Sequence, residues 1–179
     1  SSFSQNLIVP NYFFRRDDNG NLTSGSGCGN DVASERPMVR KFIVDSVKYW
    51  ANEYNMDGFR FDLMGLMDIK TINEITAALK KIDPTILVIG EGWNMGTLPA
   101  NQKANQLNIQ KLNGVSHFND QIRDGIKGSV FDSADTGFAT GKFGARNDVM
   151  SGIVGNVDYS TTINSKWTTA YPGQSVSYV

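Results

Sequence analysis

Residues 55–65, "NMDGFRFDLMG", decide the fold because they place two charged side chains within an apolar, strand-like segment. Successive side chains of an extended chain point to opposite faces, so Arg60 and Asp62 share one face. The other face carries three apolar side chains, Phe59, Phe61 and Leu63. We therefore predict a strand that packs its aromatic face on helices and leaves Arg60 and Asp62 on the other side of a sheet.

The segment before this strand has helical periodicity. Apolar residues recur at three- and four-residue steps over residues 36–54, which predicts an amphipathic helix with Ser34 as its N-cap and Pro37 in its first turn. We expect its buried stripe to consist of Met38, Phe42, Ile43, Val47, Trp50 and Tyr54.

A second helix and a second strand follow. Thr71 and Glu74 have the spacing of a capping box, and Pro84 ends the periodic segment. Its apolar stripe comprises Ile72, Ile75, Leu79 and Ile82. The next segment, "TILVIGEGW" at residues 85–93, is a continuous apolar run that is too short for a helix, which is typical of a strand buried on both faces of a parallel sheet.

The alternation of helices and strands indicates an α/β protein. The remaining signals are weaker. Residues 114–120 and 174–179 are short strand candidates, and residues 121–128 favour a helical turn. We expect the Gly-, Asn- and Ser-rich opening up to Asn30 to be a long loop and residues 131–173 to be irregular.

Composition excludes several classes of function. The 179 residues are 40% hydrophobic and 20% charged with a formal net charge of -1, so no basic field for nucleic acid is present. No apolar run approaches the ~18 residues of a membrane span, and the chain does not start like a signal peptide. Cys28 and His117, each the single residue of its type, form neither a disulfide nor a zinc cluster. We expect His117 to be a polar residue of a loop or strand end.

Two acidic residues, Asp62 and Glu91, end the two consecutive predicted strands. Adjacent parallel strands lie ~4.8 Å apart, so the two carboxyls could approach the ~5 to 5.5 Å that retaining glycosidases use. Alternatively, each acid caps a helix or forms a local ion pair. Arg60 would hold Asp62 ionised, as a nucleophile requires, whereas an apolar wall at Trp93 would favour the protonated form of Glu91. Trp93 suits either stacking on a sugar ring or ordinary packing.

These residues carry a resemblance to a known family. "DGFRFDLMG" (57–65) and "GEGW" (90–93) resemble two signature segments of the α-amylase superfamily. Their sequences are most similar in kind to those of type I pullulanases, which debranch starch and glycogen. Residues 10–31, 33–65 and 118–128 resemble the same enzymes. The resemblance implies a partial (β/α)8 barrel, about its middle four βα units, with residues 1–179 forming one segment of a catalytic domain.

The resemblance also implies roles for individual residues. Asp62 would be the nucleophile and Glu91 the general acid/base in retaining hydrolysis of α-1,6 linkages. Arg60 would orient Asp62, and Trp93 would line the sugar site. Residues expected to border the substrate, or to have purely structural roles, are Gly29, Asn30, Asp31, Asn119, Asp120 and Arg123. Gly65 and Leu66 occupy the place where many superfamily members have a histidine or lysine.

Two further signature segments of the superfamily have no counterpart in this sequence. They would supply the transition-state aspartate and two sugar-binding histidines. A complete barrel needs ~250 residues, so we expect the remainder of a parent polypeptide to complete this one and the isolated chain to be inactive.

Other interpretations remain open. The chain could be a non-catalytic α-glucan-binding or scaffold segment, or its parent could have a neopullulanase- or isoamylase-type specificity. A metal site of Asp57, Asp62 and Asp68 is disfavoured because Asp57 and Asp62 face opposite sides of one strand. No cofactor is required, and no loop has the spacing of a Ca²⁺ site, although structural Ca²⁺ occurs among superfamily members. The expected partner is an α-glucan, with neither nucleic acid nor membrane.

Overall fold

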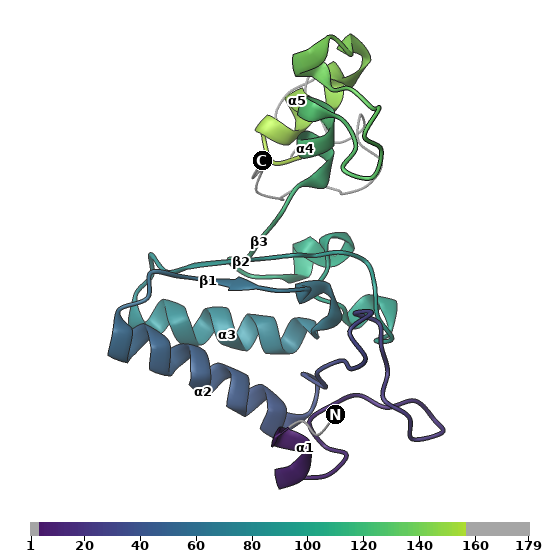
Figure 1. The fold of residues 1–179 in the computed structure, drawn as a ribbon. Helices are drawn as coiled ribbons and strands as arrows, with labels where there is room; N and C mark the ends of the chain where they lie inside the picture. The colour runs from purple at the N-terminus through teal and green to yellow at the C-terminus, as the bar shows by residue number, and fades with distance from the viewer. Residues whose placement is uncertain (1–3, 157–179) are drawn as a thin grey trace. The chain divides into compact units, whose positions relative to one another are not determined.

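The computed structural model describes residues 4–156 (Figure 1). The chain divides into two compact units, residues 1–115 and 116–179. The described helices and strands of the first unit are α1 (Ser4–Ile8), α2 (Pro37–Tyr54), β1 (Gly58–Phe61), α3 (Ile69–Ile82) and β2 (Leu87–Gly90). Those of the second unit are β3 (Ser116–His117), α4 (Asp120–Lys127) and α5 (Arg146–Ile153).

The first unit is an α/β layer structure, which confirms the α/β class that the alternation of helices and strands predicted. Strands β1 and β2 are parallel, with Gly58 opposite Leu87 and Phe61 opposite Gly90. Figure 1 shows α2 and α3 side by side on one face of these strands. Phe59 and Phe61 pack on the apolar core beneath the sheet, as predicted. The core residues that the helices contribute are Val47, Ala51, Ile72, Ile75 and Leu79.

Helix α2 has the predicted extent, but its buried face is different. Its buried residues are Val39, Arg40, Val47 and Ala51. Four of the six residues predicted to be buried, Met38, Phe42, Trp50 and Tyr54, are 42 to 61% exposed. Helix α2 contacts α3 through a different side from the one that carries most of its apolar side chains. Periodicity alone therefore selected the wrong flank.

Both predicted N-caps were wrong, although Pro37 lies in the first turn of α2 as predicted. Arg36 is the N-cap of α2, with Pro37 as the first helical residue, while Ser34 donates its hydroxyl to Asp68 at 2.9 Å. Asp68, rather than Thr71, caps α3 and accepts the Thr71 N–H at 3.0 Å. The Arg40 guanidinium donates to the same buried carboxylate at 3.2 Å. The cap of α3 is thus also one half of a long-range ion pair.

Strand β2 is not buried on both faces as predicted. Val88 is buried toward the helices, whereas Leu87 on the opposite face is 59% exposed. Leu87 and Ile89 share that face with Arg60, according to the register of the two strands. Leu87 stays largely exposed among the described residues, so the burial predicted for this face is not seen there.

The second unit confirms the short strand and the helix after it. Ser116 and His117 form β3, and α4 extends the predicted helical turn to eight residues. The prediction that residues 131–173 are irregular missed α5, which is weakly amphipathic and therefore has little periodic signal. The strand candidate at 174–179 lies outside the described residues. The opening was expected to be a loop and contains the short helix α1.

Candidate active site

The candidate site is the pair of carboxylates at the carboxyl ends of β1 and β2. Because Phe61 lies opposite Gly90, the next residues, Asp62 and Glu91, leave the sheet at the same edge. The Arg60 guanidinium joins them: its Nη1 lies 2.5 Å from Asp62 Oδ1 and its Nη2 lies 2.9 Å from Glu91 Oε1. The two terminal nitrogens of one planar guanidinium therefore bind both carboxylates.

The two carboxylates differ in exposure. The Asp62 side chain is 75% exposed and that of Glu91 is 23% exposed. Apart from Arg60, Asp62 accepts no hydrogen bond from the residues that the structure describes. Glu91 is held further, because its Oε2 accepts the backbone N–H of Leu63 at 3.0 Å. The carboxyl of Glu91 is thus surrounded by donors rather than by the apolar wall that the sequence predicted.

Arg60 is a permanent cation at this edge. The hydrogen bond with Asp62, together with the charge of Glu91, raises the pKa of the Arg60 guanidinium above its ordinary value. This arrangement suits a nucleophilic carboxylate at Asp62.

The backbone of residues 63–65 packs on the segment that carries Glu91. Gly65 donates its N–H to the Glu91 carbonyl at 3.0 Å, and Glu91 donates its own N–H to the Phe61 carbonyl at 3.2 Å. A Cβ on Gly65 would lie 2.0 Å from the Trp93 carbonyl oxygen. Trp93 is half-buried, and its stacking on a sugar stays a prediction. The glycine at 65 is required by this close approach.

Residues 24–31 form a loop that is held together by hydrogen bonds to the Asp31 carboxylate. The buried Asp31 carboxylate accepts hydrogen bonds from Thr23 Oγ1 at 2.7 Å, Gly25 N–H at 2.8 Å and Ser26 N–H at 3.0 Å. Burial alone would raise the pKa of Asp31, but the donors, first of all the Gly25 N–H, outweigh it and lower the pKa. Both oxygens of Asp31 therefore stabilise the loop.

This loop and the carboxyl end of β1 line a common cavity of about 390 Å³. Asp62 and Leu63 contribute from the strand end, and Asn30 and Asp31 contribute from the loop. Gly25 lies against Gly96, where an added Cβ would be 2.4 Å from Gly96 Cα, so the loop also packs on the chain beyond Glu91. The structure thus brings Asn30 and Asp31 to the cavity that Asp62 lines.

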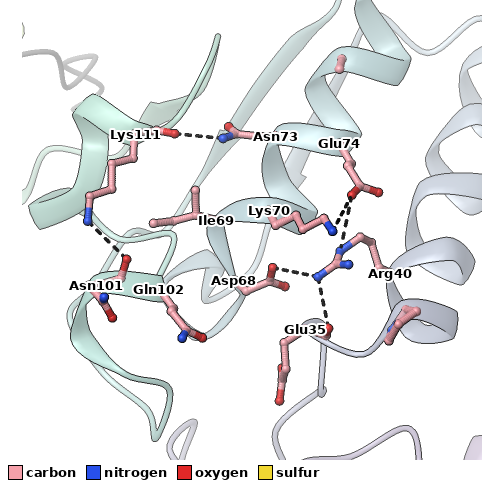
Figure 2. Close-up of a pocket in the computed structure, with 12 residues that line it drawn as sticks. Glu35, Arg40, Asp68, Ile69, Lys70, Asn73, Glu74, Asn101, Gln102 and Lys111 are labelled. Carbon is pink, nitrogen blue, oxygen red and sulfur yellow. Dashed lines mark hydrogen bonds and ion pairs between the residues drawn. The ribbon is translucent and has the colours of Figure 1, made fainter.

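A larger cavity, of about 890 Å³, lies beside the amino-terminal ends of α2 and α3 (Figure 2). Its polar groups are bonded to one another. Arg40 pairs with Asp68 at 3.2 Å and approaches Glu74 at 3.9 Å, while Asn73 donates to the Lys111 carbonyl at 2.9 Å. Because these side chains stabilise the packing of the helices, the cavity offers few free groups to a ligand.

The other predicted site residues have distinct local environments. Gly29 is exposed in the loop, with φ of +87°. In the second unit, Asn119 caps α4 by accepting the N–H groups of Gln121 and Ile122, and Arg123 pairs with Asp124 at 2.6 Å. Asp120 lies in the first turn of α4, and His117 is fully buried in β3. Their roles toward a substrate stay predictions.

Leu63 was predicted to share the helix-facing side of the strand with Phe59 and Phe61, but β1 ends at Phe61 and Leu63 instead lines the cavity beside Asp62. Its backbone is left-handed, with φ of +44° and ψ of 45°, and this conformation directs its N–H to Glu91. Leucine rarely adopts this conformation, so the left-handed backbone could not be predicted from the residue type.

Within the described range, no three His, Cys, Asp or Glu residues are grouped as metal ligands, and no helix combines the length and apolar character of a membrane span. Of the three acids weighed for a metal site, Asp57 is exposed and Asp68 belongs to the buried Arg40 pair.

Comparison with known proteins reveals clear relatives, although no protein-family profile matches the chain. A pullulanase of Bacillus subtilis (strain 168) is 46% identical over 172 residues, which are 96% of this chain and 24% of the relative. The crystal structure of a mutant pullulanase from Paenibacillus barengoltzii, complexed with maltotetraose, matches 98% of this chain and 27% of its own, with TM-score 0.90 and 44% identity. The pullulanase of Anoxybacillus sp. LM18-11, complexed with maltotetraose, matches 85% of this chain and 22% of its own, with TM-score 0.82 and 48% identity. The chain thus spans about a quarter of each relative.

Proposed function

We propose, because this chain matches type I pullulanases over most of its length, that it forms the part of a debranching glycoside hydrolase that carries the nucleophile and the acid/base. The observation that carries the proposal is the Arg60 guanidinium, which holds Asp62 and Glu91 together at the ends of adjacent parallel strands. The substrate class is an α-glucan with α-1,6 branch linkages, such as pullulan, starch or glycogen.

The proposed reaction is a double displacement. An Asp62 carboxylate oxygen attacks the anomeric carbon, the glycosidic C–O bond breaks, and Glu91 donates its proton to the departing oxygen. Water then attacks the same carbon, Glu91 accepts a proton from it, and the bond to Asp62 breaks. Two inversions retain the anomeric configuration. The exposure of Asp62 and the fixed position of Glu91 support this assignment of roles.

We further infer that residues 1–179 are one segment of a (β/α)8 barrel, about its middle four βα units. The parallel β1–β2 pair with helices on one face supports this inference, and the uncovered face with Arg60 and Leu87 would be the barrel interior. The rest of the parent polypeptide is then a required partner. It would also supply the transition-state aspartate and the sugar-binding histidines.

We assign Trp93 and Asn30 to the sugar-binding surface, with Asp31 supporting the loop at the cavity. Asn119 and Asp120 are assigned to the next rim position of the barrel. A neopullulanase- or isoamylase-type specificity would use the same carboxylates, so it differs in the preferred linkage rather than in the chemistry. A non-catalytic glucan-binding role would use Trp93 without turnover.

The test uses the complete protein that contains this chain. Asp62→Asn and Glu91→Gln should each abolish pullulan hydrolysis, measured as reducing-sugar release. Asp57→Asn, which changes an exposed aspartate just before the same strand, should leave hydrolysis near its original rate. A fluorosugar glycosyl fluoride should leave a covalent adduct on the Asp62 peptide, detected by mass spectrometry. Unchanged hydrolysis by Asp62→Asn would refute the proposal, and maltotriose binding without any turnover would favour the scaffold alternative.

A further inference from the structure

We propose that the backbone of Leu63 is a positioning element for the acid/base Glu91. The inference rests on the proposed function, since it assigns a role at the same site. It starts from an unusual juxtaposition: the residue directly after the nucleophile has a left-handed backbone, and its N–H donates to Glu91 Oε2 at 3.0 Å.

The conformation of Leu63 costs free energy, because left-handed backbone places the Cβ of an L-residue close to its carbonyl oxygen. Such conformations persist where the surroundings determine them and are enriched at functional sites. Here the short turn that follows holds Leu63: the Leu66 N–H donates to the Leu63 carbonyl at 2.9 Å. The half-buried Leu63 side chain also lines the cavity beside Asp62.

The turn is joined to the Glu91 segment at a second point. Gly65 donates its N–H to the Glu91 carbonyl at 3.0 Å, and its Cα approaches Trp93 so closely that a Cβ would meet the Trp93 carbonyl oxygen. Residues 63–65 therefore bind Glu91 through its backbone and its side chain together. The same turn begins at Asp62, so one rigid element sets the positions of both carboxylates.

Two donors fix the plane of the Glu91 carboxyl. Arg60 holds Oε1 at 2.9 Å, and Leu63 holds Oε2 at 3.0 Å. With both oxygens held, the carboxyl cannot rotate about its terminal torsion, which is otherwise soft. Without the Leu63 N–H, only the half-exposed Arg60 side chain would orient it. Loss of this orientation should slow proton transfer to the leaving group, because that transfer depends on a positioned acid.

The experiment removes the N–H and nothing else. In the complete protein, Leu63 is replaced by leucic acid through nonsense suppression, so an ester takes the place of the amide and the side chain is kept. The matched control is the same replacement at Leu112, whose N–H donates to the Ile109 carbonyl at 3.0 Å in another short turn and holds neither Leu63 nor Glu91. Two substrates are compared: pullulan, whose leaving group needs a proton, and α-maltotriosyl fluoride, whose fluoride departs with little acid assistance.

The ester at 63 should lower kcat/KM for pullulan about 10- to 100-fold, the range expected for a lost hydrogen bond to a charged group. First-turnover fluoride release should fall less than threefold, and the ester at 112 should leave the ratio between the two substrates unchanged. Equal losses on both substrates, or the same ratio change at 112, would overturn the proposal. Glu91→Gln separates the proposed function from the positioning role of Leu63. If Glu91→Gln still hydrolyses pullulan, the proposed function fails. If Glu91→Gln is inactive and the ester at 63 has no effect, only the positioning role fails.

Discussion

Replacing Arg60 with lysine should separate the chemistry of this site from the stability of the fold. Lysine keeps the positive charge but has a single nitrogen, whereas the guanidinium places Nη1 on Asp62 and Nη2 on Glu91. The ammonium can reproduce only part of this geometry. The fold should hardly respond, because lysine keeps the positive charge and the aliphatic stem of the side chain.

The expected magnitudes differ for the two quantities. Because the charge is kept, the change in stability should be at most about 1 kcal/mol, so the melting temperature should move by no more than a few degrees. A lost hydrogen bond to a charged group costs about 1.5 to 3 kcal/mol, and expressed in the transition state this lowers kcat/KM about 10- to 150-fold.

The assay is pullulan hydrolysis by the complete protein, followed as reducing-sugar release, with thermal unfolding measured on the same samples. Arg146→Lys is the matched control, because it makes the same exchange at an exposed position in the second unit. That control should change neither quantity. Wild-type activity in Arg60→Lys, or an activity loss matched by a comparable loss of stability, would contradict the assigned role of the guanidinium.

Three further predictions follow from the packing. Asp68→Asn leaves the buried Arg40 with only Glu74, 3.9 Å away, as an anion and should weaken amide-exchange protection of α3 by roughly 3 kcal/mol, or about 150-fold. Burial opposes ionisation of Asp68, but the hydrogen bonds from Thr71 and Ser34 outweigh burial and lower the pKa of Asp68. The stabilisation from Asp68 is therefore present above about pH 4 and is lost as pH falls through the pKa of the folded state. Amide-exchange protection of α3 should show this loss in the wild type but not in Asp68→Asn. Gly65→Ala should lower activity at least tenfold, about 1.4 kcal/mol, because its Cβ would clash with the Trp93 carbonyl, whereas Gly144→Ala, with open space around it, should be silent. Residues 1–179 alone should release no measurable reducing sugar from pullulan, and any release that disappears with Asp62→Asn would prove this wrong.

The sequence by itself determined the order of the elements and the location of the two acids. Helical periodicity and short apolar runs are local properties, so α2, α3, β1 and β2 could be predicted from neighbouring residues. Asp62 and Glu91 could be paired because parallel strands in register end at the same edge of a sheet. Only strand alternation was needed to place Arg60 beside them.

Tertiary structure decided what depends on distant neighbours. The buried side of α2 was selected by the contact with α3, and Asp68, the cap of α3, is buried beside its counter-ion Arg40, which lies 28 residues earlier in the chain. Leu63 adopts a left-handed backbone that its residue type disfavours, since the turn packed on Glu91 requires it. These features share one physical cause: each is stabilised by a partner far away in the sequence, and local preference is too weak to oppose it.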